Sequence, residues 1–409
     1  MQNGYSPGYG ATPDYDYRGA LDSFLRATAD PLPQIERILE ANPEFVRAHV
    51  LRAGVAVAAK TARALKDLRR ALEAASRIND AVSAHERAHL EAARAWLQGC
   101  PLLAAERYSQ IVRHSPVDLL ALRLAQSCWF FLGRGSAMRD VAAHALPFWE
   151  PRMPDYDSML SLAAFGHAEA GDSGRAEALA LQALDIEPRS PVAIHAFAHA
   201  LHAQERHGEG ARWMRERKPD WWIGDRLKLH NQWHLAMFEV MAGAPHCAAE
   251  AFEDSILPSV IAGASDPVDA TSLLWHLQRM GAEDASRWPL LAQLWDRSLS
   301  PGFWPFLDVL AAVAYANAGD TARLHQHAHR LATIAHGDSC AARLAQVATV
   351  PIMRALTSAP DTLDSTQRWP RAALESLGAS QPQRKLLERM LSTTGHLRPR
   401  VQTSRSVAA

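Results

Sequence analysis

The chain has 409 residues, of which 48% are hydrophobic and 21% are charged, so it can bury a large core and lies within the range of ordinary folded proteins. Lysine and arginine number 43 against 44 acidic residues, so we expect no attraction to nucleic acid. No run reaches the roughly 18 apolar residues of a membrane-spanning helix. The four cysteines form no Cys-x-x-Cys pair, which argues against a disulfide framework and a structural zinc site. We therefore predict a cytoplasmic protein without nucleic-acid or membrane partners.

The pattern of the chain changes after residue 17. Residues 1–17 are rich in Gly, Tyr, Pro and Asp and show no periodicity, so we predict a disordered tail. Over residues 18–395, apolar residues recur about every 3.6 positions, beginning with Leu21, Phe24 and Leu25, and alternating strand patterns are absent. This region is predicted to be all-α. Residues 396–409 are predicted to form a second disordered tail.

Turn residues recur at regular intervals along the helical region. Four prolines follow helical stretches and lie 70–73 residues apart, close to twice the 34-residue period of a tetratricopeptide repeat: Pro43, Pro116, Pro188 and Pro258. Glycines are predicted to mark turns between paired helices at Gly133, Gly171, Gly208, Gly243, Gly281 and Gly319. The predicted fold is a single all-α domain, a tetratricopeptide-like solenoid in which antiparallel helix pairs form a right-handed superhelix.

Two mid-chain stretches carry closely spaced histidines. His195, His199 and His202 follow the i, i+4, i+7 spacing of one helix face. His230 and His234 form a second pair one turn apart. Two helices can therefore direct imidazoles toward one place.

Several longer sequence motifs carry a resemblance to a known family. They include Trp129-Phe-Phe-Leu-Gly133, His195-x3-His199, His230-Asn231-x-Trp233-His234 and the stretch that begins at Asp269. From about Asp22 to about Arg384, the chain resembles the tetratricopeptide repeat protein 38 family. The resemblance implies a shared fold and a shared pocket, for which the candidate residues are His199, His230, Asn231, Trp233, His234, Asp269 and Asp308.

The chain departs from this family at several positions. The family commonly has His where this chain has Gln126, and Glu near His202. A Phe-Asn-Asp-x-His word is replaced by one that contains Leu307 and Leu310. If the replaced residues take part in chemistry, this member is altered or inactive.

The spacing of the candidate residues predicts that they converge on one pocket. In a solenoid, inner-face positions about one repeat apart become neighbours. His199 precedes the second histidine pair by about one repeat, and Asp269 and Asp308 follow at intervals of 35 and 39 residues. Polar groups on such an inner face cost stability unless they pair or meet a ligand.

Three interpretations of the histidines remain open. They could be hydrogen-bonded packing residues. They could hold a divalent metal, although residue 231 is Asn rather than the Glu of a His-Glu-x-x-His word. They could also form a metal-free acid–base site, with His199 or His234 titrating near neutrality and Asp269 or Asp308 fixing the tautomer.

We predict binding of a peptide, a partner protein or a small ligand on the concave surface as the main role, with no required cofactor. The alternative is an enzyme that uses the histidines and aspartates. An interaction scaffold should expose its aromatic residues in a groove, whereas an enzyme should bury its histidines and aspartates. The sequence leaves open whether the chain forms a homodimer.

Overall fold

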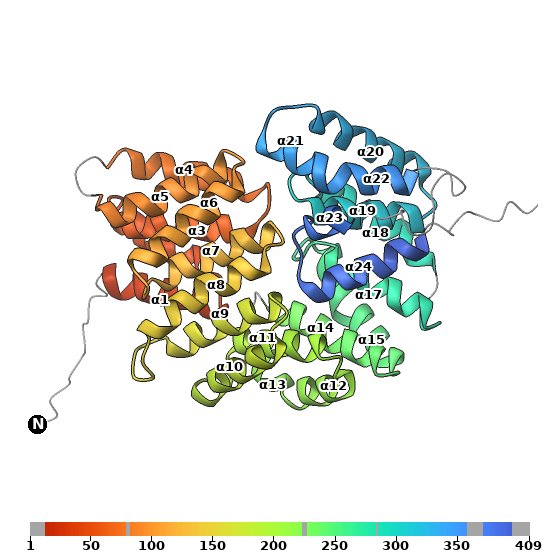
Figure 1. Ribbon diagram of the computed structural model, residues 1–409, viewed down its shortest axis with the longest axis horizontal. Coiled ribbons are helices and arrows are strands. Elements are labelled where there is room, and N and C mark those ends of the chain that lie inside the picture. The colour runs from red at the N-terminus through yellow and green to blue at the C-terminus, as the bar shows by residue number, and fades with distance from the viewer. Residues whose placement is uncertain (1–12, 79–81, 223–226, 284, 358–370, 395–409) are drawn as a thin grey trace, which may run out of the picture. The chain divides into compact units, whose positions relative to one another are not determined.

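The computed structural model describes residues 13–78, 82–222, 227–283, 285–357 and 371–394. These residues form helices and turns, and none of them forms a strand, which confirms the predicted all-α class (Figure 1). They divide into two compact units, residues 1–204 with 214–231 and residues 205–213 with 232–409. Whether residues 18–395 act as one domain stays a prediction.

The first unit is a stack of helix pairs. Each helix packs against the next one and often against the one after that, as α9 does against α10 and α11. This is the contact pattern of tetratricopeptide-like repeats. The elements are α1 (Pro13–Arg26), α2 (Leu32–Ala41), α3 (Val46–Ala59), α4 (Ala64–Ser76), α5 (Ala84–Leu97), α6 (Pro101–His114), α7 (Leu119–Phe131), α8 (Gly135–Ala145), η1 (Leu146–Phe148), α9 (Tyr156–Glu169), α10 (Ser173–Ile186), α11 (Pro191–Ala203) and α13 (Lys218–Trp221).

Two helices run across the division, α12 (His207–Glu216) and α14 (Lys228–Met241). The second unit continues the pairing, with α19 packed against α17, α18 and α20. Its elements are α15 (Pro245–Ala251), η2 (Phe252–Ile256), α16 (Leu257–Ile261), α17 (Val268–Arg279), η3 (Ala285–Arg287), α18 (Trp288–Ser298), α19 (Pro305–Asn317), α20 (Thr321–Ala335), α21 (Cys340–Leu344), η4 (Ala345–Thr349), α22 (Val350–Thr357), α23 (Arg371–Glu375) and α24 (Gln381–Thr394). Of these, η2 and η4 are π-helical turns.

The chain becomes helical earlier than predicted. Helix α1 begins at Pro13, so residues 13–17 belong to a helix and not to the predicted tail. Asp14 and Asp16 lie in the first turn, where negative charge stabilises the helix dipole. Residues 1–12 and the predicted tail at 396–409 lie outside the described residues.

Small residues allow the helices of the first unit to approach closely. Gly135 is the clearest case, since a Cβ built there would lie 2.1 Å from the carbonyl oxygen of Glu169. Helix α8 therefore begins directly against the last residue of α9. Alanines such as Ala164 and Ala176 are fully buried and fill other tight contacts. Among the described residues, every helix is too short or too polar to span a bilayer.

Candidate functional site

Helix α11 presents two of the predicted histidines. Ser190 caps the helix by accepting a hydrogen bond from the backbone N–H of Ala193 at 3.2 Å, and Pro191 occupies the first turn. The cap fixes where the helix begins. His195 and His199 then lie one turn apart on the same face, with Nε2 of each ring 3.1 Å from Nε2 of the other.

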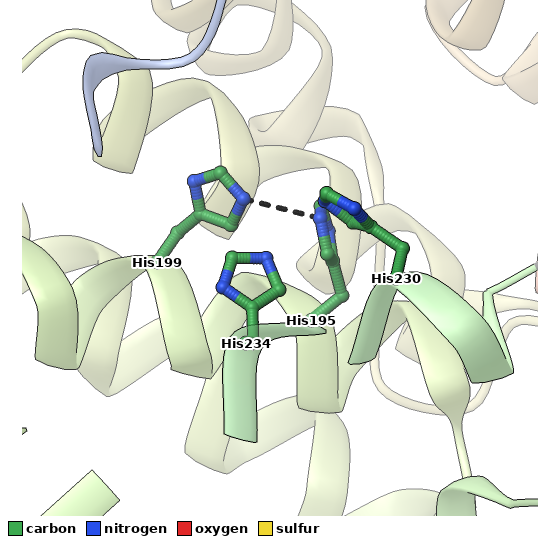
Figure 2. Close-up of side chains that lie close together, drawn as sticks. All are labelled: His195, His199, His230 and His234. Carbon is green, nitrogen blue, oxygen red and sulfur yellow. Dashed lines mark hydrogen bonds between the residues drawn. The ribbon is translucent and has the colours of Figure 1, made fainter. Parts of the chain in front are cut away.

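Helix α14 supplies the other pair. The side chain of Asn231 donates a hydrogen bond to the carbonyl oxygen of Pro191 at 3.4 Å, which ties the start of α14 to the start of α11. The rings of His195 and His230 lie 5.2 Å apart. His234 follows one turn after His230. One ring nitrogen from each of the four histidines lies within 4.8 Å of the others (Figure 2). We call these four residues the histidine site.

Two side chains of α9 support the α11 rings from behind. Nδ1 of His199 lies 3.0 Å from Oε1 of Glu169, and both side chains are buried. Phe165 packs edge-on against His199 at 5.2 Å and also contacts His195 at 5.3 Å. These contacts turn Nε2 of His199 toward His195.

Two of the four histidines are partly exposed to solvent. His199 and His234 are buried, whereas His195 and His230 are half-buried. Burial lowers the pKa of His195 well below its ordinary value, and the neighbouring His199, His230 and Arg123 lower it further. His195 is therefore a neutral imidazole at pH 7, the form that binds metals and accepts protons.

The remaining predicted residues have separate local roles. Trp233 is buried and donates a hydrogen bond to Ser272 Oγ at 2.9 Å. Asp308 is fully buried in α19 and accepts a hydrogen bond from the backbone N–H of Gly302. Asp269 lies in the first turn of α17. The convergence of Asp269 and Asp308 with the histidines stays a prediction.

The positions that depart from the family pattern are mainly structural. The side-chain amide of Gln126 donates hydrogen bonds to the carbonyl oxygens of Met138 at 3.2 Å and Leu162 at 2.9 Å, so it ties α7 to α8 and α9. Leu310 is buried in the apolar core and Leu307 packs against it. His202 is half-buried in the last turn of α11.

Eight tryptophans lie between residues 213 and 304, and most of them are core residues. The fully or nearly fully buried ones are Trp221, Trp233, Trp275, Trp288 and Trp295. Trp222 is exposed, and Trp213 and Trp304 are half-buried. These five rings therefore pack in the core and line no open groove.

The described chain is thus an all-α helical-repeat protein of the tetratricopeptide-like type, with a histidine site on α11 and α14. No family model matches it. It is similar to a solved structure described as "Crystal Structure of Rap Protein Complexed with Competence and Sporulation Factor", with 12% identity, a TM-score of 0.49, and coverage of 82% of this chain and 95% of that one. The finer resemblance to the tetratricopeptide repeat protein 38 family stays a prediction.

Proposed function

We propose that this protein binds a divalent transition-metal ion at the histidine site. The observation that carries the proposal is the convergence of ring nitrogens from His195, His199, His230 and His234 within 4.8 Å of one another. Imidazole nitrogen is a preferred ligand of Zn²⁺, Cu²⁺, Ni²⁺ and Fe²⁺. The sequence predicted no required cofactor, and the convergence of four ring nitrogens is the observation that favours a metal.

The distances support an ion of this size. Zn–N bonds of about 2.0–2.1 Å place two nitrogens of a tetrahedral site about 3.3–3.4 Å apart. The Nε2 atoms of His195 and His199 are 3.1 Å apart, so this pair needs little adjustment.

Glu169 supports the same assignment. A histidine that binds a metal through one ring nitrogen usually directs the other toward a carboxylate, which fixes the tautomer and raises the basicity of the ring. Nδ1 of His199 is 3.0 Å from Glu169, and Nε2 is the atom that meets the other histidines.

The burial of the aromatic residues favours site chemistry over an open groove. A scaffold that binds peptides through exposed rings should show its tryptophans at the surface, but five of the eight between residues 213 and 304 are packed in the core. His199 and His234 are buried in the way expected of a chemical site. Binding of a peptide or partner protein stays a prediction without a surface assigned to it.

The test is a metal titration of the full chain after removal of metal by a chelator. We expect about one equivalent of Zn²⁺ or Co²⁺ to depend on the histidine site. The half-buried positions give the cleanest variants, His195→Ala and His230→Ala, which should each lose this equivalent. His202→Ala, on the same helix but outside the cluster, is the matched control. Unchanged binding in both site variants would remove the proposal.

A second candidate is a metal-free acid–base site, favoured by the contact between His199 and Glu169. A buried carboxylate beside one ring nitrogen leaves the other to accept a proton from a substrate. This candidate predicts turnover of a small molecule by metal-stripped protein, lost in His199→Gln. The metal proposal predicts that stripping abolishes any such turnover.

A further inference from the structure

A second histidine cluster lies in the first unit, away from the histidine site. His85 and His89 are one turn apart on α5, and Asp118 caps the start of α7. Nε2 of His85 and Nε2 of His89 are each 2.8 Å from the same oxygen, Oδ2 of Asp118. The three ligand atoms lie within 4.8 Å of one another.

Neighbouring contacts hold these three side chains in place. The other carboxylate oxygen of Asp118, Oδ1, accepts a hydrogen bond from the backbone N–H of Ala121 at 2.8 Å, so the carboxylate cannot rotate freely. His89 is buried and packs edge-on against Tyr108 at 5.9 Å. The two ring nitrogens therefore converge on one carboxylate oxygen that is itself held in place.

The cluster forms part of the wall of a groove with a volume of about 810 Å³. The groove is lined on its other sides by side chains that include Tyr17, Arg18, Arg47 and Trp149. His85 is exposed, so an ion can enter from the groove. A site with three protein ligands and one open position is the usual arrangement of catalytic zinc.

We propose that His85, His89 and Asp118 bind a Zn²⁺ ion whose open coordination position faces this groove. The spacing of His85 and His89 is that of the His-Glu-x-x-His word, in which two histidines on one helix face bind zinc. Two nitrogens and a carboxylate oxygen form a donor set that suits Zn²⁺. The ion would replace the protons that now join the imidazoles to Asp118.

Glu86, the second residue of that word, has a structural task here. Its Oε2 accepts hydrogen bonds from the backbone N–H of Ser83 at 2.8 Å and from the Ser83 hydroxyl at 2.7 Å, as part of a capping box. We therefore assign metal binding to His85, His89 and Asp118, and we assign no proton transfer to Glu86. It is independent of the histidine site.

The test uses metal-stripped full-length protein and Co²⁺ as a spectroscopic substitute for Zn²⁺. We expect His85→Ala to lower the affinity of one Co²⁺ equivalent roughly 100-fold or more, since loss of a ligand should exceed the 10–100-fold effect of a supporting residue. His85 is exposed, so this variant should fold. His114→Ala, an exposed histidine of α6, is the matched control.

A second variant separates metal binding from helix capping. Asp118→Ser keeps a side-chain oxygen that can cap α7 but removes the carboxylate. We expect the same Co²⁺ equivalent to be lost while helix content by circular dichroism is kept. The assignment is overturned if both His85→Ala and Asp118→Ser bind Co²⁺ as the unchanged protein does. Both substitutions are also made in a His230→Ala background, which removes metal binding at the histidine site. Any Co²⁺ equivalent that His230→Ala still binds, and that the added His85→Ala or Asp118→Ser removes, then belongs to this cluster.

Discussion

Glu169 offers the sharpest test of how the histidine site is tuned by a single residue. Its carboxylate lies 3.0 Å from Nδ1 of His199, and it is not one of the four proposed metal ligands. Replacement by an amide of the same shape, Glu169→Gln, should weaken metal binding about 10–100-fold without removing the site. The measurement is competition with a chromophoric chelator. An affinity equal to that of the unchanged protein would show that Glu169 is only a packing partner.

Asp308 should ionise at a higher pH than an ordinary aspartate. Burial raises the pKa of Asp308 well above its ordinary value, with only the backbone N–H of Gly302 opposing that effect. Because the folded pKa is raised, this group favours folding below the unfolded pKa of about 3.9 and loses that contribution as pH rises through the folded pKa. Asp308→Asn keeps the shape and an acceptor oxygen, so its stability relative to the unchanged protein should improve as pH rises.

The control for that prediction is Asp308→Ala. This variant leaves the N–H of Gly302 without its acceptor and opens a small cavity, so it should cost about 1–3 kcal/mol. Urea denaturation at several pH values gives both results. Equal losses for Asp308→Asn and Asp308→Ala at every pH would contradict a raised pKa of Asp308.

The sequence predicted the histidines of the site, but it did not predict the carboxylates that contact the histidines. His199 and His230 were found because helical spacing is readable along the chain. Glu169 was missed because its contact with His199 exists only once α9 packs against α11. His85 and His89 carry the same one-turn signal, but Asp118 meets them only through the packing of separate helices.

At the scale of helices, a substitution at Gly135 tests how closely α8 and α9 approach each other. A methyl group there would lie 2.1 Å from a backbone oxygen of Glu169, so one helix must shift. We expect Gly135→Ala to destabilise the protein by about 1–3 kcal/mol. Gly174→Ala in α10 is the matched control, because a Cβ there meets nothing within 4 Å.

The control should be neutral or should stabilise by about 0.5–1 kcal/mol, since alanine in a helix loses less backbone entropy than glycine. Thermal unfolding of both variants measures the difference. Similar melting temperatures for the two variants would mean that α8 moves at no cost.

The predicted helix ends agree with the structure where a proline directly after the helix prevents it from continuing. Pro43, Pro116 and Pro188 follow the ends of α2, α6 and α10 as predicted. The predictions at Pro258 and Gly208 were wrong. Pro258 lies inside α16, where the π-helical turn η2 before it accommodates the missing N–H. Gly208 lies inside α12, not in a turn between helices.

At the scale of the whole chain, the sequence predicted an all-α repeat because helix pairing depends on local periodicity and regularly spaced turns. Five of the predicted turn glycines have φ between 69° and 87°: Gly133, Gly171, Gly243, Gly281 and Gly319. Such angles favour glycine, so these turns are encoded locally. The two compact units were not predicted, since they depend on contacts between distant helices.

Two buried histidines of the second unit should make the stability of the folded chain fall in acid. Burial lowers the pKa of both His276 and His327 to about 4. An unfolded histidine has a pKa of about 6.5, so between these values the unfolded chain binds more protons than the folded one. The free energy of unfolding should therefore decrease as pH falls from about 6.5 to about 4, by on the order of 3 kcal/mol for each ring.

Urea denaturation between pH 7.5 and pH 4 measures this loss. His276→Leu removes one titrating ring, and the slope of stability against pH should become shallower in this variant even if its stability at pH 7.5 is lower. His329→Gln, at an exposed position on α20, is the matched control. A His276→Leu slope that matches the unchanged protein would mean that His276 is not a source of the acid sensitivity, and the same comparison with His327→Leu would then decide the other ring.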